Sequence, residues 1–251
     1  MKVEAVKTHK ITARESGIFE ILDRYLPLLE ERTVVAVTSK IIALCEGRVL
    51  PLDESKKDDI IVQEAEWYLP RSSSKYNVMM TIKGSGICFS SGVDESNANG
   101  YFVLWPKDPQ QSANEIREHL VKKHRKKDIG VIITDTTSVP LRWGQRGVFA
   151  LAHSGFSALN SYIGKFDLFG RQFKMTSAAV SDALAATAVL IMGEGAECTP
   201  LAIFTELPFV AFQRRNPTQR EINKLKMNKE DDLFTPLLEA VPWKKGGSTP
   251  L

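Results

Sequence analysis

Two short acidic segments carry the residue types that bind divalent cations. The first is Ser91-Gly92-Val93-Asp94-Glu95-Ser96-Asn97, where two neighbouring carboxylates accompany hydroxyl and amide side chains. The second is Asp135-Thr136, which closely follows the apolar run Ile129–Ile133. Such hard oxygen ligands suit Mg²⁺ or Mn²⁺, and metal sites draw carboxylates from separated segments. The alternatives are an Asx-rich turn at the first segment and a helix N-cap at the second.

Two further segments combine arginine with glycine. In the first, Arg142 precedes Gly144 and Gln145 lies between Gly144 and Gly147; in the second, Arg171 closes the run Asp167–Arg171. Guanidinium groups bind carboxylates and phosphates through paired hydrogen bonds, so we take Arg142, Gln145 and Arg171 as candidates for holding substrate carboxylates. Surface salt bridges are the alternative. The sequence contains neither GxxxxGK[ST] nor GxGxxG, so it does not support a P-loop or Rossmann nucleotide site.

The composition excludes several classes of protein. The 251 residues include 33 Lys and Arg against 30 Asp and Glu, a formal net charge of +3, and 43% are hydrophobic. This small excess does not predict binding to nucleic acid. No apolar run approaches the roughly 20 residues that cross a bilayer, and the N-terminus lacks the apolar segment of a signal peptide. With three widely spaced cysteines and no CxxC pair, we expect a cytoplasmic protein without a disulfide scaffold, whose cysteines behave as buried small hydrophobes.

The elements that must position these residues alternate between helix and strand. Apolar spacing predicts helices, and short β-branched or apolar runs predict strands. A change of character at Arg214 suggests a charged C-terminal appendage, residues 214–251, on a main region of residues 1–213. The expected helices are 17–26, 112–122, 175–191 and 221–229, and the expected strands are 34–37, 129–133 and 200–205. Open α/β sheets place ligands at the carboxyl ends of their strands, which draws attention to Asp135.

Taken in order, these motifs resemble one family. Gly92-Val93-Asp94-Glu95-Ser96-Asn97, Ile133-Thr134-Asp135-Thr136, the Gly144-Gln145 segment, Gly164–Gly170 and Met192-Gly193-Glu194 occur with the order and spacing of coenzyme F(420)-0:L-glutamate ligases, over about residues 34–205. The resemblance implies a two-domain α+β fold, an intertwined homodimer, GTP (or ATP) as energy source, and Mn²⁺ or Mg²⁺. It also implies L-glutamate as one substrate and a deazaflavin as acceptor.

The same resemblance implies roles for single residues. Asp94, Asp135 and Thr136 would be metal ligands, Asn97 would contact the nucleotide, and Ser39 and Lys40 fall at the family's early nucleotide contacts. Glu194 takes the place of a glutamine near the metal and is a further ligand candidate. The chain departs from the family at Leu44, where a lysine is expected. A branch of similar proteins proposed to add γ-glutamate to folates is therefore a competing acceptor assignment.

The expected chemistry is amide formation through an activated acid. An ionised carboxylate resists attack by an amine, so the acceptor carboxylate would first take the γ-phosphoryl group to form an acyl phosphate. Asp94 and Asp135, with their cation, would neutralise the phosphates. A metal-dependent phosphohydrolase and a non-catalytic nucleotide-binding protein remain as alternatives.

Overall fold

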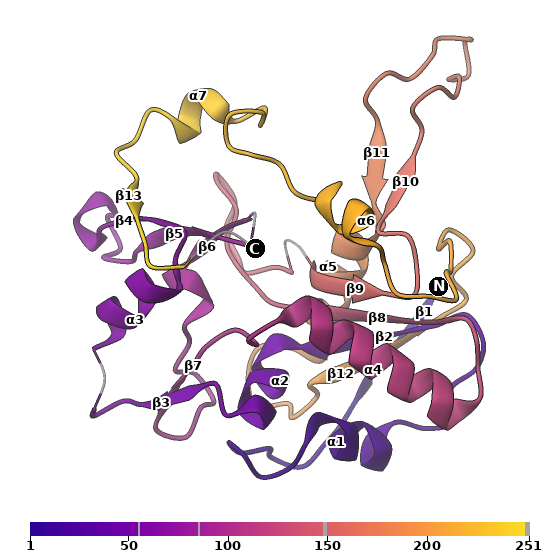
Figure 1. Ribbon diagram of the computed structural model, residues 1–251, viewed down its shortest axis with the longest axis horizontal. Coiled ribbons are helices and arrows are strands. Elements are labelled where there is room, and N and C mark those ends of the chain that lie inside the picture. Colours follow the sequence, from indigo (N-terminus) through magenta and orange to yellow (C-terminus); the bar gives the residue numbers. More distant parts are fainter. Residues whose placement is uncertain (55, 85, 148–149, 249–251) are drawn as a thin grey trace.

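A five-stranded mixed sheet lies at the centre of the molecule (Figure 1). The computed structural model describes residues 1–54, 56–84, 86–147 and 150–248. Strands β2 and β8 pair in parallel, from Thr33↔Ile129 to Thr38↔Thr134, and the other three pairs are antiparallel. The sheet order is β1 (Lys2–Val6), β12 (Leu201–Thr205), β2 (Thr33–Thr38), β8 (Ile129–Thr134) and β9 (Ala150–Ser154).

Helices cover both faces of this sheet. Helices α1 (Ile18–Tyr25) and α4 (Pro109–His124) pack on the face that carries Val35 and Val131, and α5 (Val180–Met192) packs on the face that carries Val34 and Ile132. Successive residues of a strand point to opposite faces, so β2 and β8 must be apolar throughout, as their sequences are. The strands predicted at 34–37, 129–133 and 200–205 and the helix predicted at 17–26 are thereby confirmed, and α4 is longer than the predicted helix 112–122.

A smaller four-stranded sheet lies beside the central one and has its own apolar cluster, built on α3 (Lys57–Glu64) and Phe102. A short two-stranded sheet and the 3-10 turn η2 (Ser90–Gly92) connect the two parts. The strands of the smaller sheet are β4 (Trp67–Leu69), β5 (Met80–Lys83), β6 (Gly86–Phe89) and β13 (Lys244–Lys245), and η1 (Arg71–Ser73) lies between β4 and β5. The other connecting elements are α2 (Ser39–Glu46), β3 (Val49–Pro51) and β7 (Tyr101–Val103). The α+β class is confirmed.

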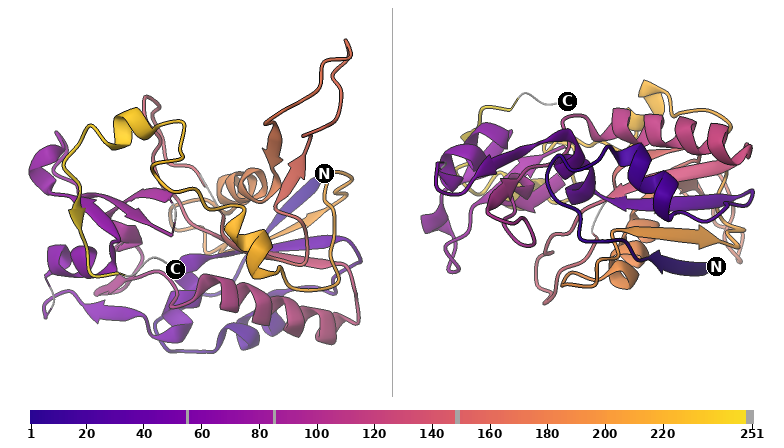
Figure 2. Two further views of the ribbon diagram at one scale, coloured as in Figure 1. Left: turned by 45° about the horizontal axis from the view of Figure 1, so that its top comes forward. Right: turned by 90° about the horizontal axis from the view of Figure 1, so that it is seen from below.

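A two-stranded ribbon projects from the main body (Figure 2). It consists of β10 (Leu159–Ser161) and β11 (Ser177–Ala179), paired antiparallel. The helix that we expected over residues 175–191 was therefore predicted too long at its start, because helix α5 begins only at Val180. Residues Ser177–Ala179 pair with β10 instead, and this pairing overrides the helical propensity of Ala178 and Ala179.

Residues 214–248 return across the molecule to the smaller sheet (Figure 1). The helix expected over 221–229 is wrong beyond its first residues, because α6 spans only Gln219–Asn223. After α7 (Thr235–Leu238), strand β13 pairs with β4. The backbone N–H groups of Gly246, Gly247 and Ser248 donate to carbonyls of residues 66, 62 and 65, so the tail satisfies carbonyls at the end of α3.

Gly246 should be intolerant of a side chain. A Cβ at this position would lie 2.1 Å from the carbonyl oxygen of Ala65, and backbone atoms cannot move aside as a flexible side chain can. We expect Gly246→Ala to lower the free energy of unfolding by about 1–3 kcal/mol. Gly17→Ala is the matched control, since nothing lies within 4 Å of a Cβ there. Urea unfolding measures both; equal stabilities would contradict the close docking of the tail.

Candidate active site

The carboxyl ends of β2 and β8 meet at one edge of the central sheet because these two strands run in parallel. Thr38 and Thr134 are paired there, and Lys40 and Asp135 follow within two residues. The loop that carries Asp94 comes from the direction of the smaller sheet and reaches the same edge. Residues from three separated parts of the sequence are brought together in this way.

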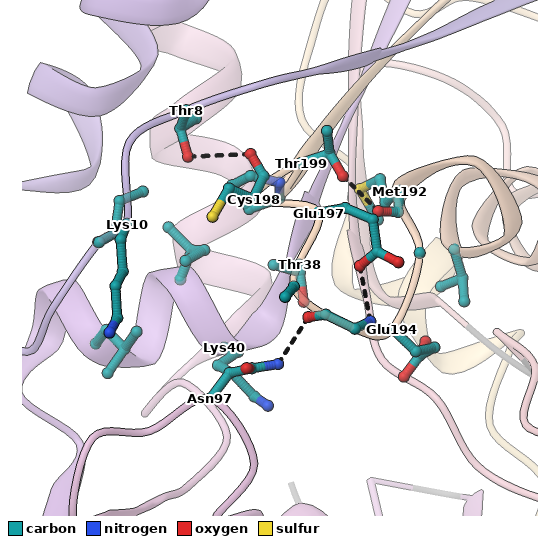
Figure 3. A pocket seen from close by; sticks show the side chains of 18 of the residues that line it. Thr8, Lys10, Thr38, Lys40, Asn97, Met192, Glu194, Glu197, Cys198 and Thr199 are labelled. Carbon is teal, nitrogen blue, oxygen red and sulfur yellow. Dashed lines mark hydrogen bonds between the residues drawn. The ribbon is translucent and has the colours of Figure 1, made fainter.

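A cavity of about 430 Å³ opens at this edge (Figure 3). Its walls come from the segment after β1, from α2, from the loop of Asp94, from the end of β8, and from the turn between α5 and β12. Its polar and charged lining residues are Thr8, His9, Lys10, Thr38, Lys40, Asp94, Asn97, Asn99, Thr134, Asp135, Thr136, Glu194, Glu197 and Thr199.

Lys40 and Asp94 form an ion pair on the cavity wall. The Lys40 Nζ donates to Asp94 Oδ2 at 2.6 Å and to the carbonyl and hydroxyl oxygens of Ser96 at 2.8 and 3.0 Å. Ser96 in turn donates its backbone N–H to Asp94 Oδ1 at 2.9 Å. Burial opposes ionisation of Asp94, but the hydrogen bonds from Lys40 and Ser96 outweigh it and lower the pKa of Asp94. Asp94 is therefore an anion near neutral pH.

Asp135 and Glu194 are in the opposite electrostatic situation. Burial raises the pKa of Asp135 to about 6, and the nearby charge of Asp94 adds to this rise. Burial and the charges of Asp94 and Glu197 likewise raise the pKa of Glu194, whose Oε2 accepts a hydrogen bond from the Thr136 hydroxyl at 3.3 Å. Negative charges are thus crowded at this end of the cavity.

This crowding is the condition that a divalent cation relieves. Asp94, Asp135, Glu194 and the Thr136 hydroxyl are hard oxygen ligands, so their chemistry fits Mg²⁺ or Mn²⁺. Within the described part of the chain, however, no three Asp, Glu, His or Cys side chains form a ready-made cage for a metal ion. A cation held here would need further oxygen ligands from a substrate or from water.

Six of the ten residues singled out from the sequence line this cavity: Lys40, Asp94, Asn97, Asp135, Thr136 and Glu194. Asn97 donates its side-chain N–H to the carbonyl of Gly195 at 2.9 Å, which ties its loop to the turn after α5 (Figure 3). Ser39 is buried at the first position of α2. Among the described residues, the lining leaves out Ser39 and also Arg142, Gln145 and Arg171, which are exposed.

Sequence patterns missed the wall formed by the segment after β1 and the turn before β12. Thr8 donates its backbone N–H to the carbonyl of Cys198 at 2.8 Å, which closes these two segments on each other. Lys10 extends from the first segment along the cavity, and the Glu197 carboxylate in the second accepts a hydrogen bond from the backbone N–H of Gly195 at 2.8 Å (Figure 3). Neither residue belongs to a recognisable motif. The expectation of buried cysteines is wrong for Cys198, which is exposed and lines the cavity.

Comparison with known proteins shows that the chain is an enzyme of the class of ligases that form carbon–nitrogen bonds. Residues 6–206 match the family model described as F420-0:Gamma-glutamyl ligase, and the chain belongs to this family.

Curated relatives agree with this assignment. The chain is similar to the coenzyme F420:L-glutamate ligase of Methanococcus maripaludis strain C7, with 40% identity over 93% of this chain and 97% of the relative. It is also similar to the enzyme of the same name from Methanopyrus kandleri, with 38% identity over 71% of this chain and 77% of the relative. Within the described residues, no helix has the length and apolar character needed to cross a membrane.

Proposed function

We propose that this enzyme joins the amine of L-glutamate to a carboxylate of coenzyme F(420)-0, driven by a nucleoside triphosphate. The observation that carries the proposal is the convergence of Lys40, Asp94, Asp135, Thr136 and Glu194 at one end of a single cavity. The names of the relatives supply the acceptor class. GTP is the proposed nucleotide, and ATP is tested beside it.

The proposed reaction has two steps. A carboxylate oxygen of the acceptor attacks the γ-phosphorus, the bond to the β-phosphate oxygen breaks, and an acyl phosphate and a nucleoside diphosphate result. The glutamate nitrogen then attacks the acyl carbon, phosphate leaves, and the nitrogen loses a proton. Catalysis of phosphoryl transfer depends mainly on positioning and on compensating charge, so the absence of a recognisable nucleophile motif in the sequence is no obstacle.

Residues of the chain have distinct tasks in this proposal. Lys40 carries the positive charge nearest to Asp94 and is placed to attract phosphate oxygens, while Asn97 holds the turn of Gly195 against its loop. Ser39 is buried, so it contributes through the first turn of α2, whose backbone N–H groups favour an anion. Asp94, Asp135, Thr136 and Glu194 would hold Mg²⁺ or Mn²⁺, which when bound neutralises phosphate charge.

The test is an incubation of the purified protein with glutamate, Mn²⁺ or Mg²⁺, and GTP or ATP. Parallel reactions contain coenzyme F(420)-0 or a tetrahydrofolate as acceptor, with mass spectrometry of the product. A glutamyl increment on the deazaflavin supports the proposal, and an increment on the folate alone moves the assignment to that acceptor. Phosphate release that needs neither glutamate nor acceptor would identify a phosphohydrolase instead and overturn the ligase proposal.

We further propose that the enzyme acts as a homodimer of two-domain subunits, joined through the β10–β11 ribbon. The ribbon tip exposes Phe166, Leu168 and Phe169, the last two at 97% and 95% of their surface. Exposed apolar groups of this size mark contact surfaces. Arg171 lies in the same ribbon, and Arg142 and Gln145 lie in another exposed loop. None of these three side chains lines the cavity of its own subunit. In this proposal they bind substrate carboxylates only when the second copy of the chain is present.

The dimer predicts a specific loss of association. We expect the double variant Leu168→Asp with Phe169→Asp to be monomeric, because dimerisation would bury two new charges without partners. Leu28→Asp is the control, since Leu28 is also exposed, at 73%, and lies away from the ribbon. Size-exclusion chromatography with light scattering gives the masses. A monomeric wild-type protein, or a dimeric double variant, would contradict the role of the ribbon.

A further inference from the structure

Trp105 contacts the strand-end carboxylate from outside the cavity. Its indole N–H donates a hydrogen bond to Asp135 Oδ2, although the two residues are thirty positions apart. Trp105 follows β7 and is only 5% exposed. It is not among the cavity-lining residues of the described chain. A buried indole needs a partner for its single donor, and here the partner is a carboxylate of the proposed active site.

The neighbouring backbone is shaped to leave room for this indole. Gly92, at the end of η2, has a φ of +72°, and a Cβ at this position would lie 2.0 Å from the indole nitrogen of Trp105. Both the backbone conformation and the space therefore require glycine. The turn that leads to Asp94 thus lies directly against the side chain that holds Asp135, so the two acidic segments are connected through Trp105.

A half-buried ion cluster lies against the indole ring. The Lys83 Nζ lies 4.9 Å from the centroid of the Trp105 ring and forms an ion pair with Glu64 at 2.7 Å. Arg48 binds the same Glu64 at 2.9 Å and donates its Nε–H to the Trp105 carbonyl oxygen at 3.2 Å. A cation above an aromatic ring is attracted to it, and the contact also polarises the ring. The ring and the backbone of Trp105 are both anchored.

We infer that Trp105 is a positioning residue, which fixes the orientation of the Asp135 carboxylate so that Oδ1 is presented to a divalent cation. This inference rests on the proposed function, because it takes Asp135 as a ligand. The Thr136 backbone N–H also donates to this carboxylate, and the rotational freedom that this bond leaves would have to be lost each time a cation bound. An indole that already engages Oδ2 removes that cost, which is the effect expected of a group that orients a metal ligand.

The test compares Trp105→Phe with Trp243→Phe. Both changes remove one indole N–H that donates to an oxygen. The Trp243 indole N–H donates to the carbonyl oxygen of Leu238 at 2.7 Å, and both of these residues lie in the C-terminal tail and outside the cavity lining. Titration calorimetry with MnCl₂ alone gives the affinity. We expect the Kd to rise about tenfold for Trp105→Phe and to stay within twofold for Trp243→Phe. The kcat of Trp105→Phe should fall about tenfold with an unchanged KM for glutamate.

Gly92→Ala provides a second variant in which Trp105 itself is retained. Displacement of the indole by the new methyl group should weaken Mn²⁺ binding as Trp105→Phe does. A protein with Trp67, Trp143 and Trp243 replaced by phenylalanine leaves Trp105 as the single indole, and its emission should change when MnCl₂ is added.

The outcomes separate this inference from the proposed function. Mn²⁺ affinity that is equal in Trp105→Phe and Trp243→Phe overturns the positioning role, even if ligase activity is found. Weaker Mn²⁺ binding in Trp105→Phe, in a protein that transfers no glutamate to either acceptor, supports the positioning role and overturns the proposed function. If the Mn²⁺ affinity is the same in the wild type, in Trp105→Phe and in Asp135→Asn, both the positioning role and the proposed function are overturned.

Discussion

Asp135→Asn is expected to abolish glutamate transfer and, at the same time, to stabilise the folded protein. The amide has the shape of the carboxylate and still offers an oxygen to the Trp105 indole, so the fold and this contact should persist. It lacks the negative charge, which is the property that a cation and a phosphoryl transfer require. Loss of a charged group at such a site costs about 10³-fold in kcat.

The gain in stability follows from the pKa of Asp135. This pKa is about 6 in the folded protein, above the ordinary value of 3.8, so the folded state binds the proton more tightly than the unfolded chain. Stability therefore falls as the pH rises from about 4 to about 6, and the whole cost is present above pH 6. With allowance for partial exposure, Asp135→Asn should gain about 1–2 kcal/mol at pH 7.5.

Thermal unfolding at pH 4 and at pH 7.5 measures this effect. The difference between Asp135→Asn and the wild type should be present at pH 7.5 and nearly absent at pH 4, where the wild-type carboxyl is protonated in the folded state. Asp53→Asn is a suitable comparison, because Asp53 is exposed and lies outside the cavity lining. A destabilised or fully active Asp135→Asn protein would contradict the assignment of Asp135 to the site.

Lys40→Met should cause the second large loss of activity, about 10²–10³-fold in kcat/KM. Three hydrogen bonds from its Nζ hold Asp94 and Ser96, and methionine keeps the length of the side chain without the charge. Asp94 would then be left half-buried without its counter-ion, so its pKa should rise and its loop should lose order. The same change removes the cation proposed to attract phosphate oxygens.

Lys57→Met is the matched control for this variant. Lys57 binds the next carboxylate of the same loop, Glu95, at 3.3 Å, and both partners are more exposed than Lys40. Exposed pairs contribute about 0–1 kcal/mol, so activity should stay within twofold. Steady-state kinetics with varied nucleotide measures both proteins. Equal losses in the two variants would mean that Lys40 only stabilises the loop.

The central layer of the fold was predictable because its signals are local. The apolar runs at 34–37 and 129–133 are buried on both faces. An uninterrupted apolar run predicts a strand that is covered on both faces, so this burial could be predicted from the sequence. The start of α5 was predicted wrongly because Ser177–Ala179 pair with a strand sixteen or more residues earlier, a contact that no local pattern records. The short α6 likewise lies in a tail without apolar periodicity.

The site was predictable only where a motif carried it. Asp94 and Asp135 stand in recognisable segments, and the resemblance connected them with Asn97 and Glu194. Lys10 and Trp105 belong to no motif: Lys10 lines the cavity, and Trp105 contacts Asp135 from outside it. The register of β2 against β8, and the closure of residues 8 and 198, are decided by long-range packing rather than by residue type.

The C-terminal tail also covers one edge of the smaller sheet, because its strand β13 pairs with β4. Strand β13 pairs with the outer side of β4, with Lys245 opposite Trp67 and Lys244 opposite Tyr68, so this side of β4 has a partner strand. In a chain shortened at residue 213, β4 would be an exposed edge strand with unpaired backbone N–H and C=O groups. Strands of other molecules can pair with such an edge. The tail therefore also protects the protein from aggregation. Its removal should cause precipitation under conditions in which the catalytic activity of the remaining soluble protein is unchanged.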